Sequence, residues 1–167
     1  MAKNLIGTLY DDGGSPIAST LTGEGLSTYG ALDVANNIYN GAAWERQAGN
    51  QSLTLITATA ATTTQTGTDQ TNVTGRGVIV VLDMTTVGTG SVTITIQGKD
   101  TASGKYFTLL AGVAVTTNST NVYTVYPGGP ASANASANAP LPRTWRVLVT
   151  ANNANPTTYT VGASTIL

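Results

Sequence analysis

The feature that most constrains the fold of this chain is the alternation of Val, Ile and Leu with Thr in short segments. In residues 91–97, Val92, Ile94 and Ile96 fall on one face of an extended chain and threonines fall on the other. Threonine supplies 31 of the 167 residues. A β-branched hydroxyl side chain suits a pleated surface with one face in water, so the alternation predicts half-buried β-strands.

Similar segments recur along the chain, and the connections between them contain Gly, Pro, Asn, Asp or Ser. They lie at residues 53–60, 77–83, 91–97, 106–110, 113–116, 121–126, 143–150 and 157–167. Many short strands separated by regular turn signals are typical of sandwiches and jelly rolls. The sequence therefore predicts an all-β protein, an antiparallel β-sandwich of jelly-roll type with about eight strands.

Local patterns indicate how some of these strands are placed. Residues 77–83 are apolar on both faces, which predicts a strand at the centre of a sheet. Residues 100–104 predict a hairpin turn into the strand at 106–110. The segments 143–150 and 157–167 flank a turn rich in Asn that ends in Pro, and we expect them to form a terminal hairpin.

Residues 1–50 differ from the rest of the chain, because they are dense in turn residues and carry their apolar residues singly. This pattern predicts an extended N-terminal arm (residues 1–50) joined to a sandwich domain (residues 51–167). Tyr39 and Trp44 argue against a wholly disordered tail. A disordered tail and short edge strands of the same domain are the alternatives that the composition leaves open.

The charge content excludes several classes of partner. Only 9% of the residues are charged, the formal net charge is −1, and no basic run is present. We therefore expect neither nucleic acid nor an anionic membrane surface as a partner. No apolar run approaches the roughly 20 residues of a membrane-spanning helix, and the first residues lack the apolar core of a secretory signal.

The inventory of reactive side chains argues against catalysis. The chain has no His and no Cys, the side chains that most often transfer protons, attack substrates or bind transition metals. Most of its carboxylates lie in turns, where they cap backbone amides. The acidic residues are Asp11, Asp12, Glu24, Asp33, Glu45, Asp69, Asp83 and Asp100. Residues 11–14 and 100–104 resemble parts of calcium loops but lack the alternating oxygen ligands. We expect no enzyme activity, no catalytic residue, no metal site and no cofactor.

The aromatic residues allow two interpretations. Trp145 alternates with two valines and is expected in the core. Tyr123, Tyr126 and Tyr159 either form a ligand-stacking patch, as in carbohydrate-binding modules, or occupy ordinary half-buried positions on strands.

Several segments resemble those of a group of phage proteins. Residues 39–50, YNGAAWERQAGN, are similar to a YNGATWDRxRGN-type motif in structural proteins of tailed bacteriophages. Further matches lie at 69–77, 96–106, 126–128, 141–147 (LPRTWRV) and 159–164. Together the matches cover most of residues 39–167. The resemblance implies a small virion structural protein from a head or tail gene cluster, and it does not say which component.

The low charge and the arm favour one component, a capsid decoration (cement) protein. Such a protein would lie on the capsid exterior of the virion, after synthesis in the host cytoplasm. Its partners would be the major capsid protein and copies of itself, as a homotrimer or another homo-oligomer. Two alternatives remain open: a receptor- or glycan-binding module of a head or tail fibre, and a tail or connector component.

The residues expected to contact partners lie mainly in the arm. The expected arm contacts are Leu5, Ile6, Leu9 and Ile17, and the expected hinge residues are Trp44 and Arg46. Arg143 and Arg146 are expected to hold inter-subunit or cross-strand partners.

Overall fold

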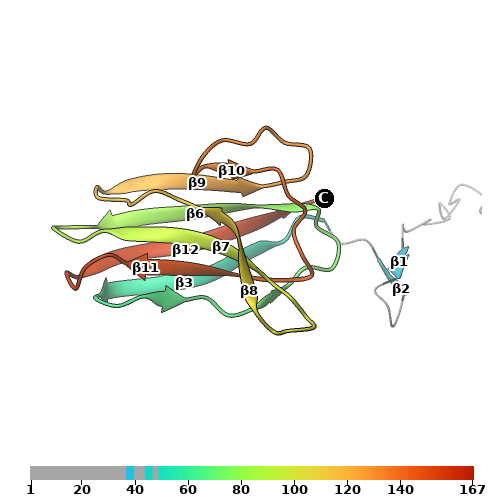
Figure 1. The fold of residues 1–167 in the computed structure, drawn as a ribbon, viewed down its shortest axis with the longest axis horizontal. Helices are drawn as coiled ribbons and strands as arrows, with labels where there is room; N and C mark the ends of the chain where they lie inside the picture. The colour runs from blue at the N-terminus through green and yellow to red at the C-terminus, as the bar shows by residue number, and fades with distance from the viewer. Residues whose placement is uncertain (1–36, 40–43, 47–48) are drawn as a thin grey trace, which may run out of the picture. The chain divides into compact units, whose positions relative to one another are not determined.

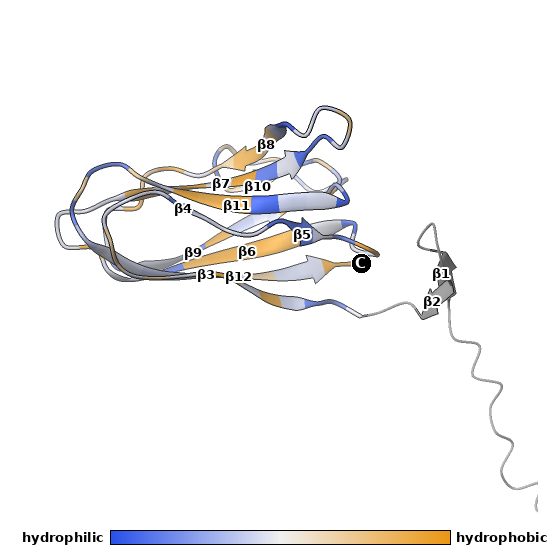
Figure 2. Cartoon of the chain, turned by 90° about the horizontal axis from the view of Figure 1, so that it is seen from below, coloured by the Kyte–Doolittle hydropathy of each residue, from blue (hydrophilic) through white to orange (hydrophobic). Residues whose placement is uncertain are grey.

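A computed structural model of the chain describes residues 37–39, 44–46 and 49–167. These residues form strands and turns and contain no helix. This part of the chain accordingly has no helix of the length and apolar character needed to cross a bilayer. The strands lie in two stacked layers, which Figure 2 shows from the side. The predicted all-β antiparallel sandwich is confirmed.

The described strands form two large sheets and one small one. They are β1 (Asn37–Tyr39), β2 (Trp44–Arg46), β3 (Ser52–Ala61), β4 (Gln65–Thr66), β5 (Gln70–Thr71), β6 (Gly77–Thr86), β7 (Val92–Lys99), β8 (Tyr106–Ala111), β9 (Ser119–Val125), β10 (Ser136–Ala137), β11 (Thr144–Ala151) and β12 (Thr157–Ile166). The small sheet is β1 paired with β2. One large sheet has the order β10-β9-β6-β12-β3, and the other has the order β4-β11-β7-β8 with β5 also paired to β11.

The pairing of the strands is that of a jelly roll. β4 and β5 both pair with β11 and act as one interrupted strand. The strands then pair from the outside of the sequence inwards: β3 with β12, β4 and β5 with β11, β6 with β9, and β7 with β8. This nested pairing is what results when a long hairpin wraps into two facing sheets. The β7–β8 turn at residues 100–104 is the tip of that hairpin, as predicted.

The predicted terminal hairpin is wrong. β11 pairs with β7 in one sheet, whereas β12 pairs with β6 and β3 in the other. Residues 152–156 therefore carry the chain between the sheets. Turn residues reverse the direction of a chain but do not decide which strand the returning segment will pair with. The strand predicted at 113–116 is reduced to a single bridge between Val92 and Val115.

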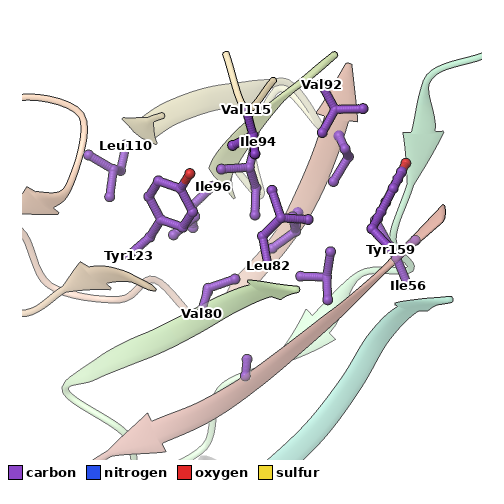
Figure 3. Packing of buried hydrophobic residues seen from close by; sticks show 14 of the residues in the cluster. Ile56, Val80, Leu82, Val92, Ile94, Ile96, Leu110, Val115, Tyr123 and Tyr159 are labelled. Atoms are coloured by element: carbon purple, nitrogen blue, oxygen red, sulfur yellow. The ribbon is translucent and has the colours of Figure 1, made fainter. Parts of the chain in front are cut away.

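The core lies between the two sheets and follows the alternation seen in the sequence. Val92, Ile94 and Ile96 are each 1% exposed, and Figure 3 shows all three in one cluster with Leu82 of β6. β6 lies between β9 and β12, the central place predicted for residues 77–83. Figure 2 shows hydrophobic colour along β6 and β11 and more hydrophilic colour near the strand ends.

Trp145 is fully buried, as predicted. It lies opposite Gly98 in the β11–β7 pair. A side chain at position 98 would meet Phe107 and Pro142, with a Cβ only 2.5 Å from the Phe107 ring. The indole Nε1 of Trp145 has no hydrogen-bond partner among the described residues. An unpaired buried donor costs about 1–3 kcal/mol, so burial of the large ring must outweigh that penalty.

Candidate interaction site

The charged side chains of the jelly roll collect at one end, which we call the charged end. At this end β6, β8 and β11 begin and β7, β9 and β12 finish (Figure 1). Seven of the eight charged residues between positions 49 and 167 belong to it. They are Asp69, Arg76, Lys99, Asp100, Lys105, Arg143 and Arg146. Five cations and two anions give the charged end a net charge of +3.

The opposite end, which we call the neutral end, carries no charged residue. It consists of the segments at 59–64, 87–91, 116–118 and 152–156. Asparagine amides hold these turns. The Asn118 Oδ1 accepts a hydrogen bond from the Val87 N–H at 2.9 Å, and its Nδ2 donates to the Thr85 carbonyl at 2.9 Å.

Asp69 is the centre of a charge cluster on the outer face of the β11-β7-β8 sheet. It lies between β4 and β5, whose pairing with β11 brings it beside the end of β7. The Lys99 Nζ lies 2.8 Å from the Asp69 Oδ2, and the Tyr106 hydroxyl donates to both carboxylate oxygens at 2.8 and 3.0 Å. Lys99 and Tyr106 are direct cross-strand neighbours, so one carboxylate ties three segments together.

Arg146 completes the cluster from the neighbouring strand. Its guanidinium carbon lies 3.3 Å from the centroid of the Tyr106 ring, a cation–π contact. Its Nε donates to the Gln97 Oε1 at 3.0 Å, because Arg146 and Gln97 are opposite in the β11–β7 register. Arg146 thus has a cross-strand partner, one of its two expected roles. An inter-subunit role stays a prediction.

The electrostatics of this cluster do not suit proton transfer near neutral pH. Hydrogen bonds from Lys99 and then from Tyr106 lower the pKa of Asp69 below its ordinary value of 3.8. The hydrogen bond to Asp69 raises the pKa of Lys99 above 10.5. Both groups therefore stay charged near neutral pH, whereas a general acid or base needs a pKa near the working pH. No group of three or more acidic residues able to hold a metal ion occurs within the described ranges.

A second part of the charged end is built around Asn72, in the connection between β5 and β6. The Asn72 Nδ2 donates to the carbonyls of Gly75 and Leu141 at 2.7 and 3.0 Å, and its Oδ1 accepts from the Gly75 N–H at 2.8 Å. These bonds fix the turn that presents Arg76. The Arg76 guanidinium carbon lies 5.6 Å from the Tyr126 ring centroid, and the Arg76 side chain is exposed to solvent.

An uncharged groove lies between the sheet edges formed by β8 and β10. Its volume is about 510 Å³, and it is lined by residues 108–111, 131–134 and 136–138. Most of these residues are Ala, Ser or Asn, and Leu109 and Leu110 add apolar surface. Next to it, Phe107 is 46% exposed and Val113 is 58% exposed. The groove is open to solvent, and no acidic or basic residue lines it.

The three tyrosines do not form a stacking patch. Tyr123 and Tyr159 are 4% and 1% exposed and belong to the core between the sheets (Figure 3). Burial raises the pKa of both hydroxyls, that of Tyr159 to about 12. Only Tyr126 is partly exposed. The three rings therefore cannot form a ligand-stacking patch. The sequence left this open, because inward-facing and outward-facing tyrosines on a strand look the same in sequence.

The residues predicted in the arm mostly lie outside the described part of the chain. This holds for Leu5, Ile6, Leu9 and Ile17. Trp44 and Arg46 lie in β2, opposite Tyr39 and Asn37 in the β1–β2 pair. Arg143 is exposed and immediately precedes β11.

Sequence reasoning did not single out Asp69, Lys99 and Tyr106 as one cluster. A signal was available, because the segments at 69–77, 96–106 and 141–147, already distinguished in the sequence, contain Asp69, Lys99, Tyr106 and Arg146. These three segments, far apart in the chain, meet at the charged end.

The fold and surface define a class: an antiparallel jelly roll with a basic end, an uncharged end and an uncharged edge groove. No family model and no curated protein matches the chain.

Proposed function

We propose that the protein is a non-enzymatic structural component of a tailed-phage virion, a capsid decoration (cement) protein that binds and stabilises the lattice of the major capsid protein. The observation that carries the proposal is that, between residues 49 and 167, the surface outside the charged end carries a single charged residue, Asp83. A surface of hydroxyl, amide and apolar groups can be covered by a neighbour with little desolvation cost.

Two features support a role in a shell. The outer face of the β6-containing sheet exposes apolar side chains, with Val122 at 55% and Ile79 at 36%, among threonines. The neutral end satisfies its turns with internal amide hydrogen bonds and needs no water to solvate an ion. Jelly rolls serve in viral capsids, which is an analogy of fold and carries less weight than the surface chemistry.

In this proposal the jelly roll lies on the capsid exterior as a homo-oligomer, and residues 1–50 reach neighbouring subunits. Many weak contacts repeated around a shell multiply through effective concentration. Jelly rolls also serve as lectin domains, so a glycan-binding fibre module is the rival. The burial of Tyr123 and Tyr159 removes two of the three rings such a module would have used.

The direct test is binding of the purified chain to capsid shells that lack it, measured by co-sedimentation. We expect the full chain to bind and a chain without residues 1–38 to bind at least about tenfold more weakly, since each lost 1.4 kcal/mol of contact is a factor of ten. Equal binding by the two chains would contradict the role of the arm.

A length-matched pair of variants separates apolar contacts from chain length. One variant replaces the four expected arm contacts Leu5, Ile6, Leu9 and Ile17 by Ser, and its control replaces Thr8 and Thr20 by Ser. We expect the first to weaken shell binding and the control to bind like the unchanged chain. Binding to glycans instead of shells would favour the rival.

A further inference from the structure

We propose that the charged end of the jelly roll is a docking surface for a second protein that presents Asp and Glu carboxylates. Five cations and two anions give this end a net charge of +3. Complementary charge speeds the encounter with such a partner and disfavours partners of the same sign. The inference goes beyond the proposed function, because it assigns one surface and the chemistry of its partner and concerns the chain outside any particle.

The two acids of the charged end are engaged by donors of their own chain. The Asp69 carboxylate accepts hydrogen bonds from Lys99 and from the Tyr106 hydroxyl. The Asp100 carboxylate accepts from the Ser103 hydroxyl and from two backbone N–H groups of the same turn. These hydrogen bonds lower the pKa of Asp100 below its ordinary value of 3.8. Both anions are therefore already paired within the jelly roll.

Two of the cations are in the opposite situation. Arg76 and Lys105 are exposed, and neither forms an ion pair with a carboxylate of residues 49–167. They come directly before β6 and β8, so their backbone is fixed by a strand. The Arg76 guanidinium carbon lies 5.6 Å from the centroid of the Tyr126 ring. A guanidinium beside a ring still presents its N–H groups along its edge, and a carboxylate can accept two of them at once.

Exposed apolar side chains occur at the same end. Phe107 is 46% exposed, Val73 is 39% exposed and Leu167 is 37% exposed. Val73 lies in the connection before β6, Phe107 is the second residue of β8, and Leu167 follows β12. Aromatic residues and Arg are enriched at interfaces between proteins, where they supply much of the binding energy. Apolar side chains beside cations therefore indicate a protein partner.

Two glycines hold aromatic rings in place at this end. Gly98 is directly opposite Phe107 in the β7–β8 pair, and a Cβ at position 98 would lie 2.5 Å from the Phe107 ring. A Cβ at Gly77 would lie 2.6 Å from the Tyr126 ring. The two rings thus lie against the backbone of the neighbouring strands. Side chains that are already fixed lose little conformational entropy when a partner covers them.

Two other partners suit this surface less well. Affinity for nucleic acid grows with the number of phosphates neutralised, and Asp69 and Asp100 among the cations oppose a continuous chain of phosphates. The jelly roll of a second copy has a single acid outside the charged end between residues 49 and 167, Asp83. Its carboxylate accepts a hydrogen bond from the Thr120 hydroxyl at 2.7 Å.

The test titrates the full chain against fluorescently labelled polymers and follows their anisotropy. One probe is a copolymer of glutamate and tyrosine, which carries carboxylates and rings, and the other is oligothymidylate, a single-stranded DNA. We expect the copolymer to bind more tightly than oligothymidylate at about 0.1 M salt, where charges are screened over about 10 Å. Binding of the copolymer should weaken as the salt is raised to about 1 M, where that length contracts to about 3 Å.

A matched pair of variants locates the binding surface. Arg76→Ala with Lys105→Ala removes two exposed cations and should weaken copolymer binding about three- to tenfold. The control, Thr117→Glu with Ala154→Glu, changes the net charge by the same amount at the neutral end. Strands of ten residues such as β6 span roughly 33 Å, several screening lengths, so the control should bind like the unchanged chain.

A second pair tests the apolar part of the surface. Phe107→Ser should weaken copolymer binding about threefold or more, because an exposed aromatic side chain at the charged end is lost. The control is Val113→Ser, which removes an apolar side chain that is 58% exposed and lies beyond the other end of β8. We expect this control to bind like the unchanged chain. Circular dichroism checks that each variant keeps its strand content.

Three results would overturn the proposal. If the unchanged chain does not bind the copolymer, the charged end is not a docking surface for carboxylates. Equal losses in the charged-end and neutral-end variants mean that net charge acts without a defined surface. Oligothymidylate binding as tight as that of the copolymer means that the partner is a nucleic acid. Each of these results leaves the shell-binding test of the proposed function untouched.

Discussion

The two ends of this jelly roll are built from the same strands but are held by different interactions. At the charged end, Asp69 bonds to Lys99 and Tyr106, and Arg146 stacks on the same ring. At the neutral end, the side-chain amide of Asn118 holds the β6–β7 turn through two hydrogen bonds. The comparison shows that a protein with few charges can concentrate them at one end and leave its other surfaces free to be covered.

The difference has an energetic meaning. Covering an ion requires its water shell to be replaced by a partner of opposite charge, whereas an amide already bonded within the chain carries little such penalty. The neutral end can therefore be buried against a varied partner. The charged end, with its net charge of +3, calls for an acidic partner.

The largest expected effect is at Gly77, at the charged end. A Cβ there would lie 2.4 Å from the Val125 carbonyl oxygen and 2.6 Å from the Tyr126 ring. Gly77→Val should therefore reduce the free energy of unfolding by about 3 kcal/mol or more, because backbone cannot yield easily. Denaturant unfolding measures it. Gly129→Ala, where the nearest atom is 3.5 Å away, is the control and should stay within about 0.5 kcal/mol. A tolerated Gly77→Val would mean that β6 and β9 approach less closely than described.

Asn72→Ala should give the next largest loss. It removes three hydrogen bonds, two to carbonyls and one from the Gly75 N–H, in a partly buried turn. We expect a loss of about 2–3 kcal/mol, since the groups left behind become unpaired. Asn72→Asp keeps the acceptor for the Gly75 N–H but turns a carboxylate oxygen towards the two carbonyls, so it should not recover the loss. A change below about 0.5 kcal/mol would show that this turn is not held by the side chain.

Asn118→Ala tests the neutral end in the same way. Two hydrogen bonds are lost, and the N–H of the buried Val87 is left without its acceptor. We expect a loss of about 1–2 kcal/mol, and its size should not change with salt. A salt-dependent loss would contradict the neutral character assigned to this end.

The smallest effect is the response of the charged end to pH. Because the pKa of Asp69 in the folded chain lies below 3.8, its ion pair stabilises the fold fully above that value and is lost as the pH falls through the lowered pKa. Asp69→Asn should cost at most about 1 kcal/mol at pH 6, and the cost should shrink towards zero in acid and in high salt. Urea unfolding at several pH values measures this. A cost that persists at pH 2 would assign the stabilisation to packing.

The strands and the core could be predicted from sequence because both follow from local period-2 alternation and turn residues. Ile94 and Trp145 are buried for that reason. The partner of each strand could not be predicted, since β11 and β12 are adjacent in sequence yet pair in different sheets.

The same limit explains the charge cluster. Asp69, Lys99, Tyr106 and Arg146 come from four separate segments, and only the nested wrapping of the jelly roll brings them together. The sequence predicted a contact role for Arg146 but not its partners, Gln97 and Tyr106. The arm contacts Leu5, Ile6, Leu9 and Ile17 stay predictions, because they lie outside the described residues.

The most direct measurement of the central claim is the number of copies of this chain in purified phage particles, relative to the major capsid protein. A decoration protein that covers the shell should be present in hundreds of copies, in a fixed ratio to the capsid subunit. A count of about a dozen or fewer, or absence from mature particles, would contradict the account.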